Sequence, residues 1–366
     1  MRLARRAAPA LEVALASSIA DHGPVWDQVV PPAQVLNRAA YLGVLERSLA
    51  TSGVRSLYAL VWRGGTPMAA CTFHVLRVER LGLTLLVAGN LVTTGAPALV
   101  AADGIGDELA AAALVSACEA AQSHERRHLG ALVLKDVPDG VCARTLTRAG
   151  FRPLAVEPSM RLDLRPSWQR LDDYARDLRS KYRRRLRGMR QSAAHLERRP
   201  LDAAAARRHR GTIDRLYAAV HGRARHAGPR LGGDHFVALA AVMAAPAYEL
   251  IGYFEDGALI GWNSRYRVGD DLASSFFGFD RTRADGLALF RNLMVDDLEH
   301  ALATGARSVH FGRTTHAIKS ELGAVPEHLA CYVRPLSPLA HPLCWVVRTL
   351  ARAPQWTARQ PFTAPR

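Results

Sequence analysis

The chain has 366 residues, enough for two or three domains of about 150 residues each, with cores that need neither metals nor disulfides. Hydrophobic residues make up 49% of it and charged residues 22%, which excludes collagen-like, disordered and membrane-spanning classes of protein. The formal net charge of +15 favours polyanionic partners.

The N-terminal segment lacks the pattern of a secretory signal, because Pro9 and Glu12 interrupt its apolar residues. Five scattered cysteines without a C-x-x-C spacing indicate neither a disulfide framework nor a zinc site. No carboxylate cluster accompanies the histidines at 221, 226 and 235. We therefore expect a cytoplasmic protein without a bound metal.

In chain order, the apolar spacing first predicts one amphipathic helix over residues 26–50. A hairpin, a third strand and an Ala-rich helix follow, the helix opened by a glycine turn and by Asp107 and Glu108. The remaining predicted elements of this half are strands 54–62, 68–78 and 83–89, helix 104–122, strand 130–137, helix 140–150 and a strand that ends the segment 153–164.

The second half repeats this order of elements. Two helices, 213–221 and 235–245, precede strands 247–255, 258–268 and 272–280, helix 286–305, strand 307–312, helix 315–323 and strand 328–336. The clearest echo lies in the last unit, where LTRAGFRP (146–153) corresponds to KSELGAVP (319–326). An internal duplication of this length predicts one fold present twice.

A strongly basic helical segment, residues 172–200, joins the two halves. Four of its arginines share one face at helical spacing: Arg179, Arg183, Arg187 and Arg190. Such a face is either a solvated surface or a contact for an anionic substrate, since guanidinium groups suit phosphate and carboxylate. Lys181 and Arg184 are the substrate-binding candidates of this segment.

A short motif follows the last strand of the second meander. Arg283, Gly286 and Ala288 form R-x-x-G-x-A at the start of a helix, which resembles the pyrophosphate loop of GCN5-related N-acetyltransferases (GNAT proteins). Small residues there let the backbone approach an anion closely. The corresponding turn of the first half, residues 101–106, keeps two glycines but lacks the basic residue. The second half is therefore the predicted cofactor domain.

The duplicated halves, the basic segment 178–189 and the motif FGRTTHAIKSELGA (311–324) together resemble the Fem-type branch of this superfamily. That branch includes peptidoglycan bridge aminoacyltransferases and tandem GNAT proteins of polysaccharide and cell-envelope gene clusters, and the resemblance covers about residues 25–338. It implies an α/β fold with mixed sheets. The division it implies is a GNAT-like domain at 1–165, a basic linker at 166–200, a second GNAT-like domain at 201–338 and a basic tail at 339–366.

The resemblance implies transfer of an acyl group from acyl-CoA, such as acetyl-CoA, to an amine of a cell-envelope precursor. The acceptor is a small molecule or a lipid-linked or polysaccharide precursor, and no metal is needed. One alternative donor is aminoacyl-tRNA, and a non-catalytic binding protein is the other alternative. The tail 339–356 either packs on the domain or contacts an anionic membrane, which would place the protein at the inner membrane face. The sequence specifies no oligomeric state.

The candidate catalytic residues lie where the strand 307–312 enters a helix, since open α/β sheets place ligand contacts there. His316 is a candidate acid or base, while Lys319 and Arg313 are candidates for holding phosphate or an oxyanion. Tyr332 is a candidate acid for the leaving thiolate, and Asn263 lines the expected acceptor pocket. For each of them the plain alternative is a core or surface residue. No residue matches the catalytic glutamate of simple acetyltransferases.

Overall fold

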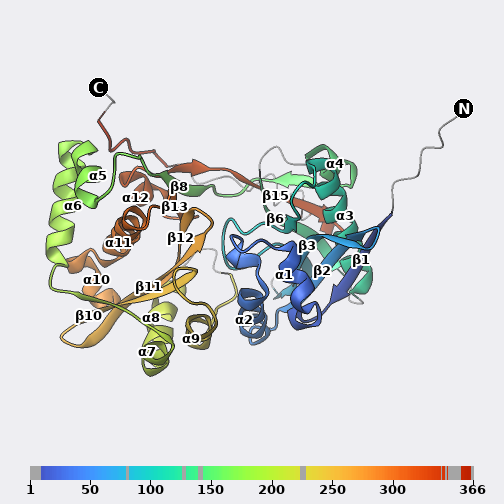
Figure 1. The fold of residues 1–366 in the computed structure, drawn as a ribbon, viewed down its shortest axis with the longest axis horizontal. Coiled ribbons are helices and arrows are strands. Elements are labelled where there is room, and N and C mark those ends of the chain that lie inside the picture. Colours follow the sequence, from blue (N-terminus) through green and yellow to red (C-terminus); the bar gives the residue numbers. More distant parts are fainter. Residues whose placement is uncertain are drawn as a thin grey trace, which may run out of the picture.

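The computed structural model describes residues 10–79, 82–125, 129–138, 143–222, 228–338, 340–342, 344 and 356–363. Figure 1 shows two sheets side by side, each with its own flanking helices. The predicted α/β class with mixed sheets is confirmed, because each sheet contains both antiparallel and parallel pairs. Among the described residues no helix is both long and apolar enough to cross a bilayer.

The first sheet has the strand order β1-β2-β3-β4-β6-β15-β7, with β5 paired to β3. Its helices are α1, α2, α3 and α4. The elements of the first half are β1 (Leu11–Ala16), α1 (Gly23–Val29), α2 (Ala39–Ala50), β2 (Arg55–Arg63), β3 (Thr66–Val78), β4 (Leu83–Ala88), β5 (Leu99–Ala101), α3 (Asp107–His124), β6 (Leu129–Pro138), α4 (Ala143–Arg148) and β7 (Arg152–Leu154).

The second sheet has the order β14-β8-β13-β12-β11-β10-β9. The elements from there to the end are β8 (Ser159–Asp163), α5 (Leu171–Asp177), α6 (Ser180–Ser192), β9 (Glu197–Pro200), α7 (Ala203–Arg208), α8 (Arg210–His221), α9 (Gly233–Val242), β10 (Tyr248–Glu255), β11 (Ala258–Val268), β12 (Asp271–Phe279), α10 (Arg281–Leu287), α11 (Leu289–Ala303), β13 (Ser308–Gly312), α12 (His316–Glu321), β14 (Val325–Glu327) and β15 (Leu329–Pro335).

The two halves exchange their last strands. β15, from the end of the chain, lies between β6 and β7 of the first sheet, while β8, from the first half, lies between β13 and β14 of the second. The segments that lead to these strands cross between the two sheets in Figure 1. Each predicted half therefore supplies one strand to the sheet of the other.

The predicted single helix over 26–50 is wrong. The chain forms two α-helices, α1 and α2, separated by a segment that contains Pro31, Pro32 and a short 3-10 helix, Val35–Asn37. Proline has no N–H for the helical ladder and disfavours helical geometry in the residue before it. The apolar spacing alone therefore predicted one helix where the prolines interrupt it.

The central parallel strands of the two sheets are paired to different extents. In the first sheet β4 pairs with β6 from Thr84 to Ala88, the end of the strand. In the second sheet β12 pairs with β13 only over Asp271–Ala273, although β12 continues to Phe279. Beyond Ala273 the two strands separate and leave a split in the second sheet.

Aromatic side chains from both halves pack into one core at the junction. Tyr41 of α2 meets Tyr266 of β11 edge to face, with ring centroids 5.8 Å apart, and both are fully buried. The same cluster contains Trp26 and Tyr58 of the first half with Phe236 of the second. This shared core fixes the two sheets against each other and positions the space between them.

Candidate functional site

Two adjoining cavities of about 560 and 330 Å³ lie at the junction of the halves. We call the larger the Lys135 chamber, because Lys135 and Glu157 line it, and the smaller the Asp297 chamber, because Asp297, Asn263 and Lys319 line it. Eight residues line both: Val92, Thr93, Thr94, Tyr217, His221, Phe276, Arg313 and Thr314.

A buried charge cluster joins the two halves at the Lys135 chamber. Asp136, at the end of β6, accepts hydrogen bonds from Lys135 Nζ at 2.5 Å and from the backbone N–H of Gly95 at 3.0 Å. Its other carboxylate oxygen is 2.6 Å from Nη1 of Arg313, which follows β13. Lys135 Nζ also donates to the carbonyl of Thr93 at 2.6 Å. Burial lowers the pKa of Lys135, and the charge of Asp136 opposes that shift.

The backbone around this cluster is strained. Asp136, Thr314 and Thr315 have φ angles of 58°, 70° and 48°, in the left-handed region that side chains with a Cβ rarely adopt. Arg313 Nε donates to the carbonyl of Glu157 at 2.7 Å, which ties the loop to the segment before β8. Strain held in place by surrounding bonds is typical of functional sites.

The predicted residues Lys319 and His316 have different surroundings. Lys319 lines the Asp297 chamber, and its Nζ donates to the carbonyls of Gly312 at 3.0 Å and Arg313 at 2.6 Å. Burial lowers its pKa to about 7. His316 Nε2 lies 3.1 Å from the carbonyl oxygen of Pro158, its ring stacks on Trp356, and it lines neither chamber.

Tyr332 lies on β15 within the apolar core of the first sheet and lines neither chamber. Asn263 and Arg313 do line the chambers, so the structure brings together three predicted site residues: Asn263, Arg313 and Lys319. Among the residues that the structure describes, no group of three or more His, Cys, Asp or Glu side chains is placed to hold a metal.

The Asp297 chamber occupies the split between β12 and β13. Residues 273–277 of β12, residues 310–312 of β13 and the face of α11 that carries Leu293 and Met294 line it. At its floor Asn263 Nδ2 donates to Asp297 Oδ1 at 2.8 Å, and Nη1 of Arg265 is 3.6 Å from the same oxygen. Burial raises the pKa of Asp297 to about 7, an effect that the Arg265 charge opposes.

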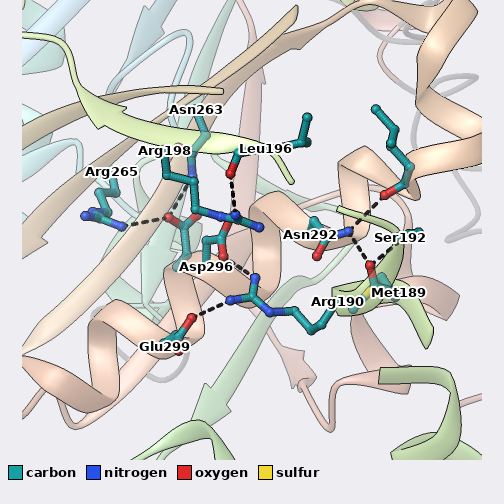
Figure 2. A network of polar contacts seen from close by, with 12 residues as sticks. Met189, Arg190, Ser192, Leu196, Arg198, Asn263, Arg265, Asn292, Asp296 and Glu299 are labelled. Atoms are coloured by element: carbon teal, nitrogen blue, oxygen red, sulfur yellow. Dashed lines mark hydrogen bonds and ion pairs between the residues drawn. The ribbon is translucent and has the colours of Figure 1, made fainter. Parts of the chain in front are cut away.

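The basic helix α6 is attached to α11 rather than to either chamber (Figure 2). Arg190 forms ion pairs with Asp296 and Glu299, and Arg198 Nε is 2.9 Å from the other oxygen of Asp296. Asn292 Nδ2 donates to the carbonyl of Met189 at 3.0 Å. The network therefore fixes the linker to the second half.

The predicted arginine face of α6 is not free as a whole. Arg179 Nε donates to the carbonyl of Phe362 and Arg183 Nη1 to that of Arg176, while Arg190 is bound to α11. The substrate-binding candidates Lys181 and Arg184 are exposed on α6 and line neither chamber.

The predicted pyrophosphate loop is a short helix, α10, and contains Arg283 and Gly286. Asp280 begins it by accepting hydrogen bonds from Thr282 N at 2.9 Å and Oγ1 at 2.7 Å, as N-terminal capping residues do. Arg283 forms an ion pair with Glu255, and Ala288 adopts a left-handed φ of 44° between α10 and α11. The open turn expected from the motif is thus replaced by a helix whose later N–H groups bond within it.

Sequence reasoning missed Lys135, Asp136 and Asp297. Lys135 is one of only three lysines and stands at the end of a predicted strand, which was a usable signal. Asp297 interrupts the apolar face of a predicted helix, and its i+4 spacing from Leu293 placed it on that face.

No protein-family model matches the chain, and no curated protein is significantly similar to it in sequence. Solved structures are similar in fold. FemX superposes with a TM-score of 0.59 at 13% identity over 92% of this chain and 100% of that one. The C-terminal domain of a putative lysylphosphatidylglycerol synthetase from Agrobacterium fabrum gives 0.56 at 12% identity, over 91% of this chain and 97% of that one.

A tandem GNAT protein from the clavulanic acid biosynthesis pathway gives a TM-score of 0.53 at 15% identity, over 90% of this chain and 99% of that one. The chain therefore has the tandem GNAT-like fold shared by these proteins, as its sequence resemblance implied. At identities of 12–15%, these similarities establish the fold and not the activity or substrates of this chain.

Proposed function

We propose that this chain is an N-acyltransferase that joins an acyl donor to an amine in the cavity between its halves. The observation that carries the proposal is the split between β12 and β13, which opens the Asp297 chamber next to the charged groups of the Lys135 chamber. The fold similarity to FemX and to a tandem GNAT protein supports the same reaction class.

The split suits an elongated donor such as acyl-CoA. Beyond Ala273 the backbone of β12 has no ladder partner on the β13 side, so a donor arm with amide groups can pair with it like an added strand. The net charge of +15 attracts the phosphates of such a donor. In this proposal Arg283 exchanges Glu255 for a donor phosphate near Gly286 and Ala288.

The proposed chemistry is attack by the acceptor nitrogen on the donor carbonyl carbon. A C–N bond forms, the carbonyl oxygen becomes negative, and the bond to the leaving sulfur breaks as the carbonyl reforms. Lys135 and Arg313 provide positive charge for that oxygen. Lys319, whose pKa is about 7, is placed to take the proton from the amine and return it to the thiolate.

A second candidate donor is aminoacyl-tRNA. Exposed Lys181, Arg184 and Arg187 on α6 favour it, because they leave part of the linker surface positive. In that case an ester oxygen, in place of a sulfur, is the leaving atom. The acceptor remains an amine of a cell-envelope or polysaccharide precursor in either case, and the proposed location is the cytoplasm, at the inner face of the membrane for a lipid-linked acceptor.

The test is thermal unfolding at physiological salt with acetyl-CoA, longer acyl-CoAs, free CoA and bulk tRNA. A ligand at 100 times its Kd stabilises by about 2.7 kcal/mol, and each kcal/mol raises the Tm of a domain of about 150–250 residues by roughly 2–4 °C. We expect a saturable rise with an acyl-CoA. Ser275→Trp, which fills the Asp297 chamber, should abolish the rise, and Gly286→Glu should do so by placing a carboxylate near phosphate.

Ser17→Trp is the matched control, because Ser17 is exposed and lines neither chamber. A rise with tRNA alone, together with product formation that stops on RNase treatment, would select the second donor. Binding without any turnover would support the non-catalytic alternative. An acyl-CoA response unchanged in Ser275→Trp would contradict the placement of the donor.

A further inference from the structure

Two residues that line the Asp297 chamber each carry a buried oxygen atom without a hydrogen-bond donor of normal geometry. Asp297 is fully buried. The Ser274 hydroxyl interacts with its carboxylate, but Oδ2 makes no hydrogen bond of normal geometry with the residues that the structure describes. Asn263 donates its amide to Asp297 Oδ1, and its own Oδ1 is likewise buried without a partner. Both residues line the chamber. Buried polar atoms are normally satisfied, so two unsatisfied acceptors on residues that line one cavity indicate a missing donor.

The neighbouring Asp296 shows what a satisfied carboxylate looks like in this helix (Figure 2). Two arginines, Arg190 and Arg198, bind its two oxygens. Asp297 has neutral donors in Asn263 and Ser274, and its nearby positive charge comes from Arg265. Nη1 of Arg265 is 3.6 Å away, while its Nε donates to Glu249 at 2.5 Å. The charge of Asp297 is therefore compensated incompletely within the protein.

We propose that Asp297 and Asn263 form a subsite for a primary ammonium group of the substrate. An ammonium group brings three N–H donors and a positive charge, which are what two unpaired acceptors and an under-compensated carboxylate lack. A phosphate or carboxylate would bring more hydrogen-bond acceptors and a second negative charge next to Asp297, so neither suits this position. Phe276, Leu293 and Met294 line the same chamber and suit an apolar stem next to the charged group.

This inference rests on the proposed function, since it names a group of that reaction's substrates. The ammonium group has two sources: the acceptor amine, or the α-amino group of an aminoacyl donor. Both present the same chemistry to Asp297. They differ in whether an ester carbonyl lies next to the nitrogen, and small probes separate them.

The experiment measures the affinity of the whole chain for hexylamine, hexanol, alanine ethyl ester and N-acetylalanine ethyl ester by calorimetry at pH 8. We expect hexylamine or alanine ethyl ester to bind at least tenfold more tightly than its neutral counterpart. Hexylamine binding alone identifies the acceptor as the source, and preference for alanine ethyl ester identifies an aminoacyl donor. Equal binding of charged and neutral probes would overturn the subsite.

Asp297→Asn should remove the preference for the ammonium probes, because it keeps the shape and deletes the charge. Asp296→Asn is the matched control: the same change one residue away, at a carboxylate that lines neither chamber. It should leave the preference unchanged. An unchanged preference in Asp297→Asn would reject the proposal.

A pH series on the unmodified chain keeps the test valid if Asp297→Asn does not fold. The charged or titratable groups that act on Asp297 are Arg265 of β11, Asp296 of α11 and Tyr253 of β10. Lys319 of α12 and His310 of β13 line the same chamber. Because the pKa of Asp297 is raised to about 7, its carboxylate is present at pH 8 and lost below pH 6. Hexylamine stays protonated across this range, as an alkylammonium group does. Its affinity should therefore fall about tenfold from pH 8 to pH 6, and an affinity that stays constant would count against Asp297.

Failure of this inference is distinguishable from failure of the proposed function. If acyl-CoA raises the Tm but no ammonium probe is preferred, the donor assignment stands and the subsite is wrong. If ammonium probes bind through Asp297 but neither acyl-CoA nor tRNA binds, the subsite stands and the transferase proposal is wrong.

Discussion

The corresponding helices α3 and α11 occupy the same place in the two repeats and bury different chemistry. The buried residues of α3 are all apolar or sulfur-containing: Ala111, Ala113, Leu114, Ala117, Cys118 and Ala121. The buried face of α11 includes Asn292, Asp296 and Asp297. The strands beside them differ in the same sense, since β4 and β6 are paired to the end of β4 whereas β12 and β13 separate after three pairs.

This difference shows how a duplicated fold divides its tasks. The first sheet is closed between β4 and β6, and its contribution to the chambers' charged groups is Lys135 and Asp136 near the end of β6. The second sheet is split, and polar groups from α11 and β11 line the opening. Arg313 connects the two at the point where both chambers meet.

The largest effect should come from breaking that connection. Arg313→Ala leaves Asp136, whose side chain is fully buried, without its guanidinium partner. Loss of one member of a buried ion pair typically costs about 3–5 kcal/mol. Because Lys135 still neutralises Asp136, we expect about 3–4 kcal/mol and a fall in Tm of roughly 6–16 °C. Urea unfolding measures the loss in free energy of unfolding, and thermal unfolding measures the fall in Tm.

Arg307→Ala is the control for this variant, because Arg307 pairs with Asp270 at the surface, where both side chains are about two-thirds exposed. Such pairs contribute about 0–1 kcal/mol. Equal losses in the two variants would show that the junction of the halves does not depend on the Arg313–Asp136 pair.

A smaller effect on stability should distinguish the end of β4, which is closely packed, from the end of β13, which borders the split. Gly89 follows β4 with a φ of 106°, and an added Cβ would lie 3.0 Å from the carbonyl oxygen of Lys135. Gly312 ends β13 with a φ of 66° and open space around it. We expect Gly89→Ala to cost on the order of 3 kcal/mol and Gly312→Ala about 1 kcal/mol, as measured by urea unfolding. Equal costs would mean that the two strand ends are equally open.

The smallest effect concerns the linker between the halves. Lys181→Ala and Arg184→Ala should change stability by less than about 0.5 kcal/mol, because both side chains are exposed. If tRNA is the donor, each should also reduce the salt dependence of tRNA affinity by about one phosphate contact. Arg208→Ala, at an exposed arginine of α7, is the control. tRNA affinity that falls equally in all three variants would indicate a general charge effect without a defined linker contact.

The sequence predicted the fold best where local pattern decides structure. The hairpin strands 54–62 and 68–78 agree with β2 and β3 within two residues at each end, and the helix predicted at 104–122 is α3. These elements have a period of two or of 3.6, or a glycine turn, so their neighbours in sequence are enough. The repeated order of elements followed from the same signals.

The strand exchange could not be predicted in this way. Nothing in the sequence of β15 distinguishes a partner in the second sheet from β6, since pairing across roughly 200 residues leaves no local pattern. The sequence predicted Asn263, Arg313 and Lys319 but missed the charge cluster of Lys135 and Asp136 for a related reason. Lys135 and Arg313 come from different halves and are brought within reach of Asp136 only by the junction of the sheets.

The exchange of β8 and β15 also governs the order in which the protein can be completed as it leaves the ribosome. β7 is paired with β15 in the sheet, so β6 has an open edge and β7 has no neighbour while only the first 165 residues of the nascent chain have emerged. The first sheet closes only after residues 329–335 have emerged. A gene cut between the repeats would therefore encode two fragments that each lack a strand, and mixing them is the route by which each could recover it.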